Sequence, residues 1–460
     1  MSSTHEHCER HMNSPDTATQ QLRTDEDLAG EAASGRRSLR RVLALRDFRL
    51  LLAGTSTSLL GDQFALIATP WLALQLSDDA LALGTVLALE GLPRALLMLV
   101  GGAVTDRVSS RRVMLVADIL RSVLTAAMAA VVLAGAAQMW MLYAFALGFG
   151  VVAGFAVPAE NSIVPTLVRR DDLQAGNAVI MGVTQFMGFA GPTLAGAVIA
   201  GFSSTTTGPG LAFAIDAVTF LVSATTFFLM RPASVVEGTD QPTGLGASIR
   251  DGVRRLWGDP AMRFVLCVLA TVNLFAVGPL MVGIPLLAHD RLPSGAMAFG
   301  VLMAAFAIGN LAGYGAAGGT RLPGARTMRA IVIGVLAAYG VVIAALGTIT
   351  NLALAAVLLA ALGAGNGYLG ITLLTWMQTR TEPSMLGRIM SLATFASLGL
   401  VSVSQAASGA ISRWSLDGLF LLSGALVLAT VAWAATQQGF RAFLTSITEP
   451  THPTDKEAVA

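Results

Sequence analysis

The stretch that decides the fold is Gly101-Gly102-Ala103-Val104-Thr105-Asp106-Arg107-Val108-Ser109-Ser110-Arg111-Arg112, a glycine pair followed by a short charged segment. The apolar runs on either side, 81–104 and 113–134, are each long enough to cross a bilayer, which takes about 20 apolar residues. This arrangement predicts a tight charged loop between two membrane-spanning helices.

The composition extends this prediction to the whole chain. Hydrophobic residues make up 54% and charged residues 12% of the sequence, whereas soluble domains have about 25% charged residues. We therefore predict an all-α membrane protein with twelve spans, at 49–75, 81–104, 113–134, 139–160, 174–200, 211–230, 262–287, 296–317, 328–347, 352–376, 389–411 and 418–436.

The arginines indicate how the chain is oriented. If the N-terminus is cytoplasmic, only Arg291 and Arg413 fall in outer segments, and the other arginines outside the spans fall in inner ones. Positive residues favour the cytoplasmic side. The bias predicts both termini in the cytoplasm.

The two halves of the chain form a weak internal repeat. Two sets of residues recur at constant offsets of 214 and 211: Gly101, Arg107 and Arg112 with Gly315, Arg321 and Arg326, and Asp171, Gly176 and Gly188 with Glu382, Gly387 and Gly399. We predict two six-helix bundles between polar segments, namely a disordered tail at 1–47, bundles at 48–230 and 261–437, a cytoplasmic linker at 231–260 and a cytoplasmic tail at 438–460.

Two polar segments have features of their own. In the linker, Ile249, Val253, Leu256 and Trp257 repeat at helical spacing, which predicts an amphipathic helix on the membrane surface. In the first tail, a cluster of possible ligands matches no spacing typical of a zinc site: His5, His7, Cys8 and His11. We predict no metal and no cofactor.

Ionisable residues inside the spans are few, and each costs about 2.5–3.5 kcal/mol at the bilayer centre unless it finds a partner or water. Glu90 and Arg94 are four residues apart, so they share a helix face and can pair. The pair could bind an ionic substrate group, exchange a proton, or only neutralise itself. Asp62 has no partner at helical spacing, and our hypothesis is that Asp62 or Glu90 carries a coupling proton.

Three other charged residues are assigned differently. Asp118 is expected to pair with the loop arginines, and Arg121 could meet Asp62 or Glu90. Asp216 is expected nearer the lipid head groups. In the span 174–200, small residues predict close helix packing and a bend: Gly188, Gly191, Pro192 and Gly196.

The opening stretch resembles the signature between the second and third helices of the major facilitator superfamily. Gly102, Asp106, Arg107, Arg111 and Arg112 match it, while Ser109 stands where the family has a second glycine. Gly191-Pro192 resembles the family's antiporter motif. Further matches resemble the branch with macrolide and enterobactin exporters, among them Leu60-Gly61-Asp62, Pro158-Ala159 and Asp216-Ala217.

This resemblance implies a fold of two six-helix pseudo-repeats with a substrate cavity between them. In the family, helices 1, 4, 7 and 10 line that cavity, and the candidates there are Asp62, Gln63, Tyr143, Asn273, Asn366, Tyr368 and Trp376. The resemblance also implies a cytoplasmic gate, for which the candidates are Gly101, Gly102, Asp106, Arg107, Arg111 and Arg112. We expect the two glycines to approach a neighbouring helix closely.

The expected function is proton-coupled efflux of a hydrophobic or amphipathic small molecule by alternating access. Many exporters of this kind carry an arginine in the fourth helix, but 143–154 contains none, so Arg94 or Arg121 would supply the positive charge. The alternatives are an importer of a small metabolite and a transporter-like sensor. An enzyme is not expected, because all five histidines lie outside the spans.

The expected partners are a small-molecule substrate, protons and the lipid bilayer. We expect no nucleic acid partner, a monomeric state and a location in a bacterial cell membrane.

Overall fold

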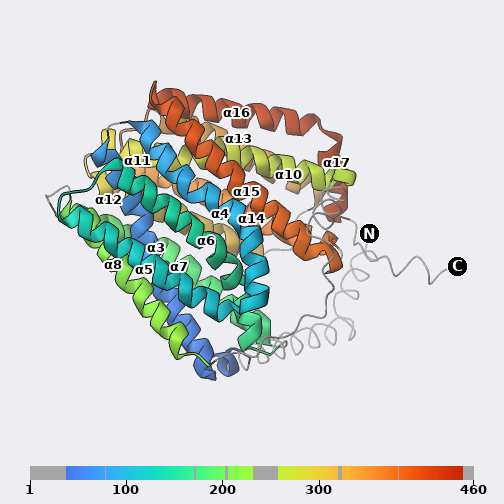
Figure 1. Ribbon diagram of the computed structural model, residues 1–460. Helices are drawn as coiled ribbons and strands as arrows, with labels where there is room; N and C mark the ends of the chain where they lie inside the picture. Colours follow the sequence, from blue (N-terminus) through green and yellow to red (C-terminus); the bar gives the residue numbers. More distant parts are fainter. Residues whose placement is uncertain are drawn as a thin grey trace, which may run out of the picture.

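The computed structural model describes residues 38–77, 79–169, 172–202, 206–231, 257–319, 324–381 and 383–448. In these ranges, twelve helices or helix combinations are long and apolar enough to cross a membrane, which confirms the predicted all-α membrane fold (Figure 1). The helices are α3 (Arg46–Leu76), α4 (Ala80–Val108), α5 (Ser110–Leu133), α6 (Met139–Leu167), α7 (Leu173–Ala200), α8 (Thr207–Leu229), α10 (Pro260–Val272), η2 (Asn273–Val277), α11 (Gly278–Asp290), α12 (Gly295–Gly319), α13 (Ala325–Leu346), α14 (Leu352–Arg380), α15 (Pro383–Ser412), α16 (Leu416–Thr436) and α17 (Gln438–Thr448).

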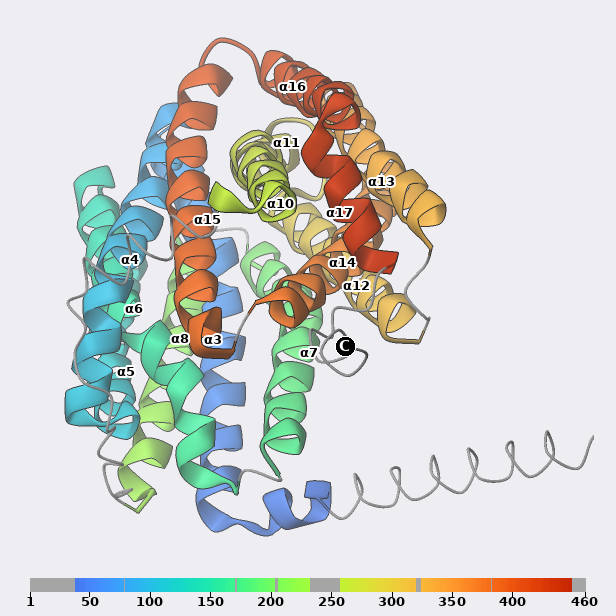
Figure 2. The same ribbon diagram turned by 90° about the vertical axis from the view of Figure 1, so that its right-hand side faces the viewer.

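The helices form two bundles, the N-half (α3 to α8) and the C-half (α10 to α17). Figure 2 shows α5, α6 and α8 on one side of the molecule and α10, α13 and α16 on the other. We call the face where α3 begins and α16 ends the terminal face, and the face where α3 ends the opposite face.

The two halves meet through α4 with α15 and through α7 with α12. Glycines on both sides allow the close approach, because a methyl group at Gly84 would lie 2.8 Å from the Cα of Gly409, and one at Gly196 would lie 3.2 Å from the Cα of Gly300. Near the ends of these helices, Arg413 Nε lies 3.1 Å from Asp79 Oδ1. These contacts join the halves towards the opposite face, and the ribbons diverge towards the terminal face (Figure 1).

The seventh span is interrupted by the π-helical turn η2. Pro279 follows it and has no N–H for the carbonyl of Phe275, with which its ring would also clash in a regular helix. A wider π turn accommodates such a proline. The carbonyl of Leu274, within the turn, accepts a hydrogen bond from the Ser404 hydroxyl of α15.

Two segments that we expected in the tails belong to the folded bundles. The helical segment 38–44 holds Val42 in the N-half core, and Arg41 donates from Nη2 to Asp172 Oδ1 at 2.7 Å. Residues 438–448 form α17, where the Phe440 ring stacks on Phe264 at 5.1 Å between centroids. We predicted tails here because these segments contain many polar residues, although each also has a buried apolar face.

Other expectations lie outside the described residues. These are the cluster His5, His7, Cys8 and His11, and the amphipathic helix at 249–256. Trp257, the last residue of that predicted helix, is described, and its side chain is exposed.

Candidate functional site

Charged residues from five helices of the N-half lie within electrostatic reach of one another inside this bundle. They are Asp62 of α3, Glu90 and Arg94 of α4, Asp118 and Arg121 of α5, Glu160 of α6, and Asp216 of α8. We call these seven residues the charged cluster. Five are carboxylates and two are arginines.

Arg121 is the central cation of the cluster. It is 5% exposed, and its Nη1 lies 3.6 Å from Glu160 Oε1. Its guanidinium lies 5.4 Å from the ring centroids of Phe149 and Phe220, the geometry of a cation–π interaction. It interacts electrostatically with Asp62, as we had considered. Its ion-pair partner Glu160, the last residue of a predicted span, was not among the residues predicted from the sequence.

Asp216 is fully buried inside the protein, and its expected place nearer the head groups stays a prediction. Gly61 of α3 packs directly against it, since a methyl group at Gly61 would lie 2.4 Å from Asp216 Oδ1. Among the described residues, neither carboxylate oxygen of Asp216 has a hydrogen-bond partner. Buried polar groups in this state are rare and point to a functional role or an unseen proton or water.

Asp118 does not have the partners we expected. It is 4% exposed and carries one buried carboxylate oxygen without a hydrogen-bond partner in the described part of the chain. Arg111, in the first turn of α5, instead donates to the carbonyls of Phe227 and Phe228, at 2.7 and 2.8 Å. Arg111 thereby caps the end of α8, where unpaired carbonyls favour a cation.

Glu90 and Arg94 form the predicted pair on one face of α4. Arg94 Nη1 lies 3.9 Å from Glu90 Oε1, and both side chains are about a third exposed. Between them on the helix, Gly91 packs against the Ser402 hydroxyl of α15, where the two halves meet. Asp62, which is partly buried, interacts electrostatically with this pair as well as with Arg121.

The gate residues divide into two groups. A methyl group at Gly101 would lie 2.3 Å from the Gly154 carbonyl oxygen, so Gly101 approaches α6 closely, as predicted. The same expectation is wrong for Gly102, which has nothing within 4 Å of such a methyl group. Arg107 and Arg112 are exposed, and the side chain of Asp106 lies outside the described ones.

Ser109, at the family's glycine position, has φ 103° and ψ 137°. In the described part of the chain it is the one non-glycine residue with positive φ. This backbone region is essentially restricted to glycine. The loop therefore holds strain that a glycine would remove.

Three of the four small residues of α7 pack as predicted. Gly191 lies against the Gln63 side chain of α3, and Pro192 and Gly196 lie against Gly300 of α12. Gly188 has no neighbour within 4 Å. The helix is continuous from Leu173 to Ala200.

The cavity candidates of the C-half take different places. Trp376 is 7% exposed, and its ring meets Phe443 of α17 edge-on at 5.0 Å between centroids. It therefore belongs to the C-half core and not to a cavity lining. Asn366 faces a pocket inside the C-half. Asn273 donates to the Leu269 carbonyl of its own span at 2.8 Å.

The remaining candidates are partly buried. Tyr143 packs against the main core of the bundles, and Tyr368 packs against the core that includes Trp376.

The profile of the Major Facilitator Superfamily matches residues 51–404 of this chain. The chain belongs to the major facilitator superfamily. It is therefore an integral membrane transporter, and the charged cluster lies inside the first bundle of such a protein.

Two similar proteins are both called multidrug efflux pump Tap. The one from Mycolicibacterium fortuitum is 27% identical over 358 residues, which cover 75% of this chain and 83% of that protein. The one from Mycobacterium tuberculosis is 26% identical over 231 residues, which cover 49% of this chain and 54% of that protein.

Solved structures of the same fold include a D-xylose–proton symporter, with a TM-score of 0.66 and 13% identity, covering 86% of this chain and 98% of that one. They also include an inward-facing, unoccupied bacterial homologue of the human lysosomal transporter Spinster, with a TM-score of 0.60 and 15% identity, covering 87% and 96%. At these identities the likeness shows the fold of the superfamily.

Proposed function

We propose that this transporter exports hydrophobic or amphipathic small molecules in exchange for protons, by alternating access. The observation that carries the proposal is the charged cluster, in which five carboxyl groups share a membrane interior with two arginines. Asp118 and Asp216 are buried, so ionising them together with the other three carboxyl groups would leave excess negative charge in a poorly solvated space, which costs free energy. Protons bound to the cluster remove that cost, and their release can be tied to a change in conformation.

Within the cluster we assign three roles. Asp62 and Glu90 exchange the protons, because both are partly exposed and can reach water. Arg121 holds the remaining negative charge in place from its buried position beside Glu160. Asp216 binds a further proton, since it is fully buried and neither of its carboxylate oxygens has a hydrogen-bond partner among the described residues.

The proposed orientation places the terminal face in the cytoplasm, as the arginine distribution favours. The two halves are joined towards the opposite face by Asp79–Arg413 and by the glycine contacts. The structure then corresponds to an inward-facing state. Formation of the gate around Asp106 and Arg107 belongs to the other state of the cycle.

The proposed substrate class follows from the absence of charged residues from the middle of the C-half spans. Their charged residues all lie near helix ends, at Arg263, Asp290, Arg326, Arg329, Arg380, Arg388 and Asp417. A sugar site needs several hydrogen-bonding groups, whereas an apolar lining suits a large, greasy molecule. The relatives named multidrug efflux pumps agree with this choice.

The test uses inside-out membrane vesicles, an imposed pH gradient with an acidic interior, and the amphipathic dye ethidium. We expect the gradient to drive dye accumulation, and a protonophore to abolish it. Asp62→Asn and Glu90→Gln are each expected to impair the proton-driven component, while dye counterflow without a gradient remains. Unchanged proton-driven transport in both variants, or accumulation driven by ATP alone, would overturn the proposal.

A further inference from the structure

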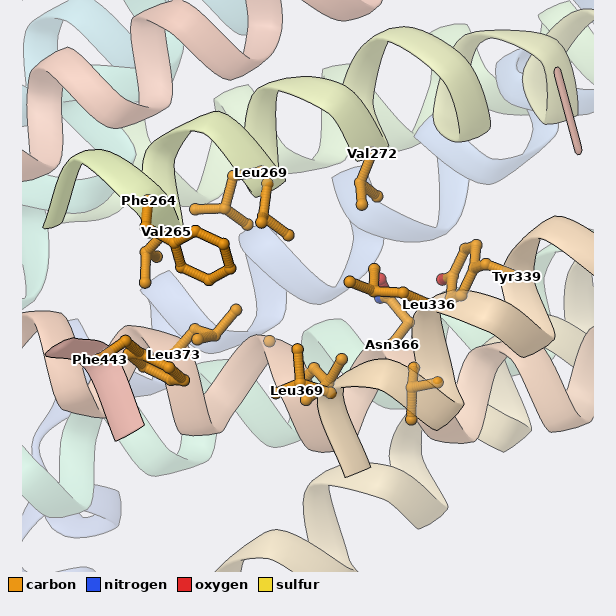
Figure 3. A pocket seen from close by; sticks show the side chains of 14 residues that line it. Phe264, Val265, Leu269, Val272, Leu336, Tyr339, Asn366, Leu369, Leu373 and Phe443 are labelled. Carbon is orange, nitrogen blue, oxygen red and sulfur yellow. The ribbon is translucent and has the colours of Figure 1, made fainter. Parts of the chain in front are cut away.

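A second enclosed space lies within the C-half, away from the charged cluster. It is bounded by α10, α13 and α14, with Phe443 of α17 at one end. Figure 3 shows Phe264 and Phe443 at one end of this pocket and Asn366 and Tyr339 at the other. Its cavity volume of about 70 Å³ is small beside the roughly 300–1,000 Å³ of a whole small-molecule site, so it suits a short stretch of a ligand.

The pocket has a structural cause in the packing of α14. Four glycines lock α14 to α12, where added methyl groups would lie 1.9–2.1 Å from backbone oxygens of the partner helix: Gly309, Gly313, Gly363 and Gly367. These pairs are the small-residue contacts that bring membrane helices together. Because α14 is drawn towards α12, its other face leaves a gap towards α10 and α13.

The lining defines what can fill the gap. Apart from Tyr339 and Asn366, the lining side chains are aliphatic or aromatic, and Gly370 adds a bare backbone. Water needs two to four polar partners and does not stably occupy such a surface. The Asn366 amide donates to Asn310 Oδ1 at 3.3 Å, which fixes the polar end of the pocket.

We propose that this pocket binds part of the hydrocarbon chain of an amphiphile, with a polar atom of the ligand near Asn366 and Tyr339. The chain comes either from a membrane phospholipid or from a free amphipathic molecule. Apolar burial supplies the binding free energy, about 25 cal/mol per Å². This site does not depend on proton coupling, because none of its lining residues belongs to the charged cluster.

Gly370 offers a way to fill the pocket without a clash. It lines the pocket, and nothing lies within 4 Å of a methyl group added to it. Gly370→Leu therefore adds a bulky side chain to the pocket wall without a clash. The matched control is Gly334→Leu on the neighbouring helix α13, where a methyl group also meets nothing within 4 Å but where the residue does not line the pocket.

The test is photolabelling of the full-length purified protein with two probes that carry a diazirine in the hydrocarbon chain. One probe is palmitic acid and the other is phosphatidylglycerol, and labelled peptides are mapped by mass spectrometry. We expect labelling at pocket residues such as Val268 and Leu336 by at least one probe. It should fall to background in Gly370→Leu and persist in Gly334→Leu.

The probe that labels the pocket identifies the source of the chain. If Gly370→Leu lowers the melting temperature strongly, Gly370→Ala replaces it and should give a partial loss. The proposal is overturned if neither probe labels pocket residues, or if the Gly370 and Gly334 variants are labelled equally. Loss of proton-driven transport in the cluster variants does not enter this test.

Discussion

The interior of the N-half holds charged side chains between α3, α5, α6 and α8, whereas the matching space of the C-half holds an apolar pocket between α10, α13 and α14. The offset of 214 that relates the halves makes the match specific. It carries Asp118 and Arg121 of α5 onto Val332 and Val335 of α13, and both valines line the pocket. Equivalent positions of the two bundles therefore hold different side chains, charged ones in the N-half and aliphatic ones in the C-half.

Each half has packing that suits its contents. In the N-half, Gly54 and Gly61 let α3 approach a buried polar stripe of α8, formed by Asp216, Thr219, Ser223 and Thr226. In the C-half, the glycines of α12 and α14 pack backbone against backbone and leave the facing space to aliphatic side chains. We expect substitutions that exchange charged and apolar side chains between the two halves to lower stability, and the predictions below run from the largest effect to the smallest.

The largest effect is expected for Arg121→Gln. Removing one partner of a buried ion pair costs about 3–5 kcal/mol, and the lower end applies here because Glu160 is 42% exposed. We expect a clear drop in melting temperature in detergent and loss of proton-driven dye transport. The control is Arg107→Gln, at an exposed arginine of the loop. Equal melting temperatures for the two variants would contradict the central position of Arg121.

The reverse exchange is Val335→Arg, which places a cation in the C-half pocket. A lone arginine within the membrane costs about 2.5–3.5 kcal/mol on insertion scales. We expect a lower melting temperature, and partial recovery when Val332→Asp supplies a carboxylate three residues away on the same helix face. If the single variant is as stable as the wild type, the arginine is solvated in the pocket, which would contradict the apolar character inferred from the lining residues.

A smaller effect on stability is expected at the residue that precedes the third span of the N-half. Ser109 precedes α5 with φ 103°, whereas Gly324 precedes α13 with φ −60°. Gly324 thus has a backbone conformation that any residue can adopt. Ser109 has one that favours glycine, and its strain is about 1–3 kcal/mol. We expect Ser109→Gly to stabilise the protein by about 1 kcal/mol, measured by thermal unfolding. Ser110→Gly, within α5, should lower the melting temperature, and a similar gain there would argue against strain at Ser109.

The smallest effect concerns the segment 38–44 at the edge of the N-half. Arg41 donates hydrogen bonds to both oxygens of Asp172 and lowers the pKa of that carboxyl. The stabilisation is therefore present above the unfolded pKa of about 4 and is lost as the pH falls through the lowered folded value. We expect the difference in melting temperature between wild type and Arg41→Gln to be small at neutral pH and to vanish in acid. A difference that does not vary with pH would exclude the ion pair as its cause.

The sequence predicted the spans well, because each must hold a long apolar run. For example, the predicted span 113–134 matches α5 at 110–133. It also predicted the pair Glu90–Arg94, since i and i+4 residues share a face of one helix. These features depend on local order along the chain.

Contacts between distant segments were harder to predict. The partner of Arg121 is Glu160, 39 positions away, and Asp216 is buried because Gly61 of another helix covers it. Trp376 was predicted to line the cavity, but it is covered by α17, a segment that we predicted to be part of a polar tail. Helical periodicity indicates which residues share a face, but not which helix covers that face.

The most direct test of the central claim compares two double variants in proton-driven ethidium transport. Asp118→Val with Arg121→Val gives the N-half the residues of the C-half, and Val332→Asp with Val335→Arg gives the C-half those of the N-half. Dye counterflow without a pH gradient shows that each variant is folded. We predict that proton-driven accumulation relative to counterflow is lost in the first variant and retained in the second. Retention in the first, or equal loss in both, would contradict the assignment of proton coupling to the N-half.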